Sequence, residues 1–299
     1  MKPYATDSVI SKDGTTIGYY RLGQGPGIIL IQGAMGTAQN FMELGEVLAD
    51  IFTVYIPDRR GRGLSDDNGA DYSIQKEVED IETLLNKTGA SYIFGLSSGA
   101  LIALQATLNL PAIRKAVIYE PPLFVNGLPT ALMKRYEKEM AEGRLAAAMI
   151  TAMQATQMGP QIFNVIPRGL LELLTNKMME SEDKSAKSGD ITMRMLAPTL
   201  QHDFQVVAEM NGKLTTFRAI NKEILLLGGS KSPNFLKADL NALEKVLPDA
   251  ARVEFPGLGH AAAWNYDKQR NPDGNPERVA QELKRSLAES EDVDIKKGK

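Results

Sequence analysis

Residues 95–99, Gly-Leu-Ser-Ser-Gly, have the composition and spacing of a serine nucleophile held on a sharp turn. Residues 91–94 favour a short strand, and the alanine-rich run 100–110 predicts a helix. A strand that turns directly into a helix leaves no space for side chains beside the turn residue, so glycine is needed on both sides. The backbone N–H groups at the start of the helix have no partner within it, and they stabilise an oxyanion that develops beside them. Ser97 is therefore a candidate nucleophile for acyl transfer.

A serine hydroxyl attacks efficiently only when a base removes its proton. The chain has two histidines, His202 and His260, and no cysteine. His260 ends the glycine-rich loop 256–260, directly after a predicted strand at 252–255, so it is the candidate base. His202 lies in a helical stretch, where we expect it to be solvated or packed against its neighbours, with a substrate contact as the alternative.

An oxyanion hole needs backbone N–H donors aimed at the negative oxygen. We expect one donor from Ser98, directly after the nucleophile. The second donor is expected from Ala34, in the turn that follows a predicted apolar strand at 27–31. In the same turn, Gln32 and Met35 are candidate substrate-binding residues, and Gln32 could instead brace the turn.

Strands and helices alternate along most of the chain. Strands are predicted at 27–31, 52–56, 91–94, 115–119, 223–227 and 252–255, a hairpin at 8–22, and helices at 41–49, 73–86, 100–110, 234–246 and 276–287. This alternation predicts an α/β fold with a mostly parallel central sheet flanked by helices.

Residues 126–220 interrupt this alternation with helical, methionine-rich segments and no convincing strand. We interpret them as a helical cap above the carboxyl edge of the sheet, where ligands bind in open α/β sheets. The core domain then comprises residues 1–125 and 221–288. The charged tail 289–299 is expected to be disordered. Within the cap, Met149 and Met153 are candidate substrate-binding residues, because methionine suits a bulky apolar ligand.

The composition excludes several classes of function. With a net charge of −3 there is no basic field for nucleic acid. Without cysteine there are no disulfides, thiolate metal sites or cysteine nucleophile. With only two histidines in the chain, a multi-histidine metal site is nearly excluded. We expect no metal and no organic cofactor. No signal peptide or membrane span is apparent, so a cytoplasmic location is expected, and nothing in the sequence indicates an oligomeric state.

Four motifs, in this order along the chain, resemble those of capped α/β-hydrolase-fold enzymes: the turn 32–36, Asp58-x-Arg60-Gly61-x-Gly63-x-Ser65, the elbow 95–99 and the loop 257–260. The resemblance implies the hydrolase fold, and it implies that the Asp58 motif braces the loop beside the nucleophile. The turn usually opens His-Gly in this family, whereas here it opens Gln32-Gly33. A serine at position 97 argues against dehalogenases and epoxide hydrolases of this fold, which need a carboxylate there.

The same resemblance bears on the acid that would orient His260. The family usually has an aspartate after the strand that follows the cap, but this chain has Ser232 there. Some members, such as the zearalenone-type lactonases, carry the acid after the strand that follows the nucleophile helix, which is Glu120 here. We expect the strand before Glu120 to lie two positions across the sheet from the loop after Leu227, so that the long Glu120 side chain could reach the ring of His260. Asp239 and Asp203 are the competing candidates.

The resulting expectation is a serine hydrolase that cleaves an ester or lactone of a mainly apolar small molecule through an acyl-enzyme. A carbon–carbon bond hydrolase or a perhydrolase would use the same triad. A ligand receptor on a hydrolase scaffold, with little turnover, is the alternative from another class.

Overall fold

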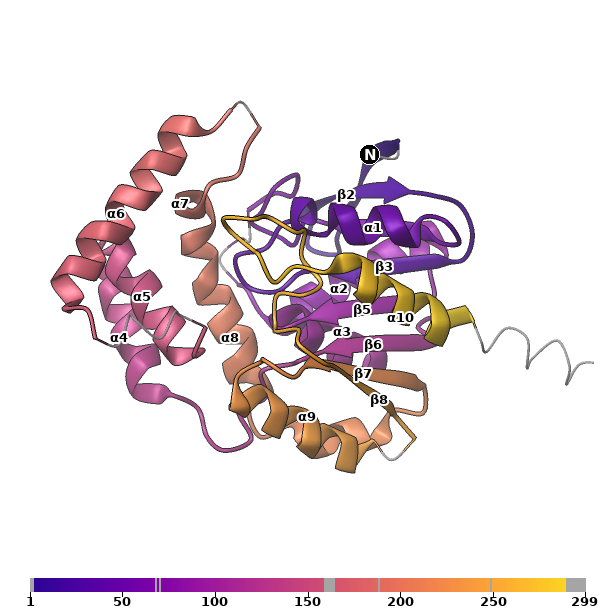
Figure 1. The fold of residues 1–299 in the computed structure, drawn as a ribbon. Coiled ribbons are helices and arrows are strands. Elements are labelled where there is room, and N and C mark those ends of the chain that lie inside the picture. Colours follow the sequence, from indigo (N-terminus) through magenta and orange to yellow (C-terminus); the bar gives the residue numbers. More distant parts are fainter. Residues whose placement is uncertain are drawn as a thin grey trace, which may run out of the picture.

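The structure is a computed structural model that describes residues 3–67, 69, 71–158, 165–187, 189–247 and 249–288. Its described residues form an eight-stranded sheet in the order β1-β2-β4-β3-β5-β6-β7-β8. The strands are β1 (Tyr4–Ile10), β2 (Thr16–Leu22), β3 (Gly27–Ile31), β4 (Thr53–Pro57), β5 (Tyr92–Leu96), β6 (Lys115–Tyr119), β7 (Glu223–Gly229) and β8 (Ala251–Phe255). Strand β2 is antiparallel to both β1 and β4, and the other neighbours are parallel. The predicted fold class is confirmed (Figure 1).

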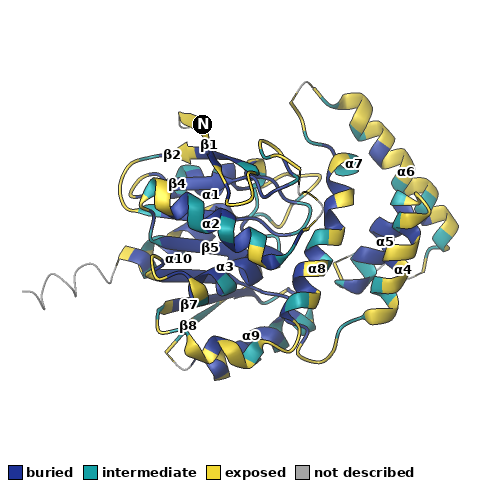
Figure 2. Ribbon diagram, turned by 180° about the vertical axis from the view of Figure 1, so that it is seen from behind, coloured by how far each residue is buried: buried dark blue, intermediate teal, exposed yellow. Residues whose placement is uncertain are grey.

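Helices cover both faces of the sheet. Buried side chains of α1 (Met42–Leu48) and α10 (Pro276–Ala288) pack on one face. Those of α2 (Ile74–Thr88), α3 (Ser98–Asn109) and α9 (Asn234–Val246) pack on the other. Because both faces are covered, the central strands are apolar throughout and do not alternate between polar and apolar residues. Figure 2 shows the central strands buried and the outer helix faces exposed.

The described residues between β6 and β7 form only helices and loops, as expected for 126–220. They contain α4 (Thr130–Ala141), α5 (Leu145–Ala155), α6 (Arg168–Ser185), α7 (Met193–Leu196) and α8 (Leu200–Met210). Helix α8 lies between the sheet and the group formed by α4, α5 and α6 (Figure 1). We call residues 126–220 the helical insertion. Its role as a cap, and the division into core and cap, stay predictions.

The strand order corrects one expectation about the sheet. β6 pairs directly with β7, from Lys115↔Glu223 to Tyr119↔Leu227. Glu120 therefore follows the immediate neighbour of β7 and is not two positions away. The expected disordered tail, 289–299, lies outside the described residues.

Helix ends follow from local chemistry. The Ser73 side chain accepts a hydrogen bond from the N–H of Lys76 and begins α2, and Gly89, at φ 69°, ends it. In the described part of the chain, no helix is both long and apolar enough to span a membrane.

Candidate active site

Ser97 lies at the turn from β5 into α3, with φ 57° and ψ −125°. This conformation is costly for a residue with a side chain, and such strain persists where the surrounding structure enforces it. The flanking glycines explain how it is enforced. A Cβ added at Gly95 would lie 2.4 Å from the carbonyl oxygen of Gly99, and one added at Gly99 would lie 2.5 Å from that of Ile31. The tight packing holds Ser97 at the carboxyl edge of the sheet.

The structure brings His260 and Glu120 together. His260 Nδ1 lies 2.7 Å from Glu120 Oε2, and the backbone N–H of Gly229 donates to Glu120 Oε1 at 2.6 Å. Both carboxylate oxygens are thus engaged. Glu120 is 0% exposed and has φ 46°, so backbone strain occurs here as it does at Ser97. A buried carboxylate held in this way orients the imidazole ring.

Tyr119 gives the histidine loop a second attachment to the end of β6. Its hydroxyl donates to the backbone carbonyl of Gly259 at 2.9 Å. Adjacent residues of one strand end therefore hold both the ring of His260 and the backbone before it. Sequence reasoning missed Tyr119, because an aromatic residue at the end of a buried strand gives the same signal as an ordinary core residue.

The other candidate acids lie elsewhere. Asp239 accepts hydrogen bonds from the backbone N–H groups of Phe124 and Val125, both at 2.9 Å, and burial raises its pKa to about 6. Asp203 is bound by arginines, as described below. Ser232, at the family's usual acid position, is buried, and its hydroxyl has no hydrogen-bond partner among the described residues.

The turn after β3 packs directly against the nucleophile. A Cβ added at Gly33 would lie 2.8 Å from the Cβ of Ser97. Ala34 follows in the same turn, and Ser98 begins α3, where the first N–H groups have no partner within the helix. The two expected oxyanion donors therefore come from the residue that follows Ser97 and from the turn that packs against it. Met35, at φ 57°, is a third strained position in this region.

Gln32 does not line a substrate surface, contrary to expectation. Its side chain is 0% exposed, and its amide Nε2 donates to the carbonyl of Pro57 at 2.8 Å. The residue braces the end of β3 against the end of β4, which was the alternative considered for it.

Comparison with known proteins identifies the fold family. A sequence profile of the alpha/beta hydrolase family matches residues 28–282. The chain belongs to this family. Over 263 residues it is 29% identical to an uncharacterized hydrolase, YraK, of Bacillus subtilis (strain 168), an alignment covering 86% of this chain and 90% of the relative.

Two further similar proteins bear on the activity. The structure of an alpha/beta hydrolase from Sphaerobacter thermophilus DSM 20745 is 30% identical, with a TM-score of 0.69, and the match covers 83% of this chain and 91% of that one. A 2-(acetamidomethylene)succinate hydrolase of Mesorhizobium japonicum (strain LMG 29417 / CECT 9101 / MAFF 303099) is 23% identical over 82% of this chain and 85% of its own length. The chain is accordingly a hydrolase of the α/β family.

The Asp58 motif of this hydrolase braces the loops around the site, as the resemblance implied. Asp58 accepts hydrogen bonds from the backbone N–H of Ala38 at 2.6 Å and of Leu64 at 2.9 Å. Arg60 binds Asp80 through two bonds of 2.7 and 2.8 Å. Both residues are buried and lie in the core of the hydrolase.

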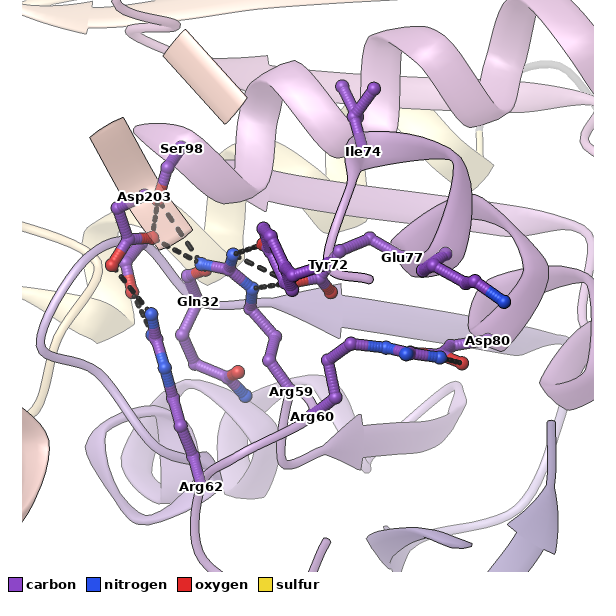
Figure 3. Close-up of polar contacts among 12 residues, drawn as sticks. Gln32, Arg59, Arg60, Arg62, Tyr72, Ile74, Glu77, Asp80, Ser98 and Asp203 are labelled. Carbon is purple, nitrogen blue, oxygen red and sulfur yellow. Dashed lines mark hydrogen bonds and ion pairs between the residues drawn. The ribbon is translucent and has the colours of Figure 1, made fainter. Parts of the chain in front are cut away.

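A buried ionic network lies beside the nucleophile, and sequence reasoning missed it (Figure 3). Arg59 contacts Glu77 and Tyr72 on one side and Asp203 of α8 on the other, the last through Nη1 to Oδ1 at 2.7 Å. Arg62 contacts Asp203 Oδ2 at 2.6 Å. The available signal was the run 59–62, which places three arginines in four positions after a buried strand.

The network is balanced in charge, since two arginines face two carboxylates. Burial alone would raise the pKa of Asp203, but the Arg62 and Arg59 guanidinium groups outweigh burial and lower it. Glu77 behaves in the same way: burial opposes its ionisation, yet Arg59 and the Tyr72 hydroxyl hold its pKa below the ordinary value of 4.5. Both carboxylates are therefore ionised in the folded hydrolase.

This balance predicts an acid-dependent stability. A carboxyl with a lowered folded-state pKa stabilises the fold fully above its unfolded-state pKa, and this contribution is lost as pH falls through the folded-state value. Glu77→Gln, which leaves Arg59 with one partner fewer, should cost about 3–5 kcal/mol of unfolding free energy near neutral pH. Urea unfolding of both proteins should show this difference shrinking below pH 4.5. A difference that stays constant or grows on acidification would contradict the assignment.

His202 of this hydrolase packs against the core. Its ring centroid lies 4.3 Å from that of Tyr72, and burial lowers its pKa. The expectation of a packed histidine fits this position, although the neighbour comes from outside the helical insertion.

Apolar residues of the insertion meet the turn after β3. Met149 belongs to a buried cluster of α4, α5 and α8, against which Ala34 and Met35 pack. Met153 lies one turn further along α5 and is half-buried. Met149 thus belongs to the apolar cluster that contacts the turn carrying Ala34, and no contact places Met153 there among the described residues.

Proposed function

We propose that this protein is a serine hydrolase that cleaves an ester or lactone of a mainly apolar small molecule. The observation that carries the proposal is the 2.7 Å contact between His260 Nδ1 and Glu120 Oε2, in a chain whose Ser97 stands on a strained turn at the same edge of the sheet. Because Glu120 accepts the proton on Nδ1, the ring presents unprotonated Nε2 as the base.

The reaction follows from these roles. His260 removes the proton of Ser97, whose Oγ attacks the substrate carbonyl carbon, and the N–H groups of Ala34 and Ser98 bind the oxyanion. The protonated histidine then donates its proton to the leaving alkoxide. Water, deprotonated by His260, attacks the acyl carbon, the bond from that carbon to Ser97 Oγ breaks, and His260 returns the proton to Oγ as the acid is released. Glu120 stabilises the imidazolium in both halves.

The apolar character of the substrate rests on the surroundings of the turn. Met149 and Met35 belong to one packed apolar group there. The Mesorhizobium relative is named for a substrate with a succinate group, which carries two carboxylates. Free cations favour the binding of such a dianion, and the two arginines beside Ser98, Arg59 and Arg62, are each bound to Asp203. We therefore favour an uncharged ester or lactone over a dicarboxylate.

A panel of p-nitrophenyl esters, aryl esters and macrocyclic lactones, assayed with wild type and Ser97→Ala, tests this function. Sustained turnover of esters or lactones by wild type alone supports it. One equivalent of product without further release would indicate a hydrolase-fold receptor. No turnover of this panel, together with turnover of carbon–carbon substrates or peracid formation in separate assays, would indicate the alternative enzymes with the same triad.

The methionines beside the turn should set the substrate range. Met149→Ala enlarges the apolar space of this cluster without touching the triad, so kcat/KM should shift towards longer acyl chains by roughly 10-fold relative to short ones. Met179→Ala is the control, because Met179 is also buried but lies in α6, outside this cluster. Equal losses on every chain length would argue against the assignment.

A further inference from the structure

Ser98 and the turn after β3, which carry the two proposed oxyanion donors, are both linked to Asp203 of α8, Ser98 directly and the turn through Arg62. The Ser98 hydroxyl donates to Asp203 Oδ1 at 2.7 Å. The other carboxylate oxygen, Oδ2, accepts from Arg62 Nη2 at 2.6 Å. All three side chains are buried. One carboxylate of the helical insertion thus reaches the residue that follows the nucleophile.

Arg62 carries the connection on to the second donor segment. Its Nη1 donates to the carbonyl of Gly33 at 2.8 Å and to that of Gly36 at 3.1 Å. These two carbonyls bracket Ala34. The Arg62 side chain therefore binds the backbone carbonyls of the turn, and the Asp203 carboxylate holds Arg62 in place.

Arg59 closes the network. Its Nη1 lies 2.7 Å from Asp203 Oδ1, 3.2 Å from Ser98 Oγ and 3.4 Å from the carbonyl of Gln32. Figure 3 shows this guanidinium between Ser98 and Asp203 on one side and Tyr72 on the other. Asp203 lies 141 residues from Arg62 and 105 from Ser98, so these contacts form only when α8 docks on the core.

We propose that Asp203 is a positioning residue for the oxyanion hole, and that docking of the helical insertion through Asp203 aligns both donor segments. This proposal rests on the proposed function, since it gives Ser98 and Ala34 a partner in the same reaction. Backbone donors stabilise an oxyanion only within a narrow range of positions, so a small displacement of either segment lowers the rate. The insertion thereby contributes to catalysis as well as to substrate range.

The test compares two ketones that differ in one methyl group, trifluorinated or not, and therefore in whether they form an adduct that carries an oxyanion. An alkyl trifluoromethyl ketone accepts Ser97 Oγ at its carbonyl carbon, the serine proton passes to His260, and the ketone oxygen becomes an oxyanion in the hole. The matching methyl ketone binds the same apolar surface without appreciable adduct formation. We define the ketone ratio as the inhibition constant of the methyl ketone divided by that of the trifluoromethyl ketone. This ratio measures how well the adduct and its oxyanion are stabilised, whereas a loosened pocket weakens the binding of both ketones alike.

Three variants make the comparison. Asp203→Asn removes the charge that holds Arg62, and Ser98→Ala removes one contact to Asp203 while retaining the backbone donor. Glu139→Gln is the matched control, because Glu139 is a buried carboxylate of α4 that binds Arg168 and Thr151 within the insertion. It weakens the insertion without contacting either donor segment.

We expect kcat on a p-nitrophenyl ester to fall about 100-fold in Asp203→Asn and about 10-fold in Ser98→Ala. The ketone ratio should fall in both, and their effects should be less than additive in the double variant because they share one contact. Glu139→Gln should keep the ratio while lowering Tm. If Asp203→Asn does not fold, Ser98→Ala decides on its own.

An unchanged ketone ratio in Ser98→Ala and Asp203→Asn would overturn the proposal, as would an equal fall in Glu139→Gln. Failure of the proposed function gives a different result, because wild type itself would then show no ester turnover and no fluorophosphonate labelling at Ser97. That result would also refute the role of Asp203.

Discussion

Ser97→Ala is expected to lower kcat for ester hydrolysis by on the order of 10⁴ to 10⁶ while leaving the fold intact. Alanine cannot form the acyl-enzyme, and the remaining activity comes from binding and the oxyanion hole alone. The hydroxyl contributes little to stability, because the turn is enforced by the close approach of Gly95 and Gly99 to neighbouring backbone. Steady-state kinetics with a p-nitrophenyl ester and a thermal melt measure both effects.

Labelling with a fluorophosphonate probe locates the nucleophile independently of any substrate. Wild type should gain one adduct at Ser97, and the alanine variant none. Ser98→Ala is the neighbouring control, since it removes an adjacent hydroxyl but retains Ser97 and should still be labelled. An active Ser97→Ala variant, or labelling at another residue, would refute the nucleophile.

Glu120→Gln should lower kcat by roughly 10² to 10⁴ with little change in KM. Glutamine matches the size of glutamate, but it loses the charge that stabilises the imidazolium. Its amide can also present N–H to Nδ1 and favour the wrong tautomer. The kcat of the variant and of wild type, measured on the same ester across pH, gives the effect.

Asp239→Asn is the control for this acid. Asp239 is also buried, but it holds the backbone of Phe124 and Val125 in the loop that follows Glu120. Its replacement should lower the unfolding free energy by about 1–3 kcal/mol and leave kcat near the wild-type value below the melting range. Near-normal kcat in Glu120→Gln together with a large loss in Asp239→Asn would move the acid to position 239.

Local sterics and chain order made much of this protein predictable from its sequence. The glycines at 95 and 99 report a turn too tight for side chains, and the structure has Ser97 strained at that turn. The apolar strands and intervening helices predicted the parallel sheet, because both of its faces need cover. The order of the motifs brought His260 and Glu120 to one edge, where they lie in contact.

Tertiary structure alone decided what depends on distant pairing. The sequence does not reveal that β6 lies directly beside β7, because the whole helical insertion separates the two strands along the chain. The direction of the Gln32 side chain, towards the carbonyl of Pro57, depends on which strand end lies beside it. Asp203 gave no local signal, because its partners are more than a hundred residues away and its role arises only when α8 meets the core. Backbone conformation is determined largely by neighbouring residues in the sequence. A buried ion pair forms only after distant segments have packed together.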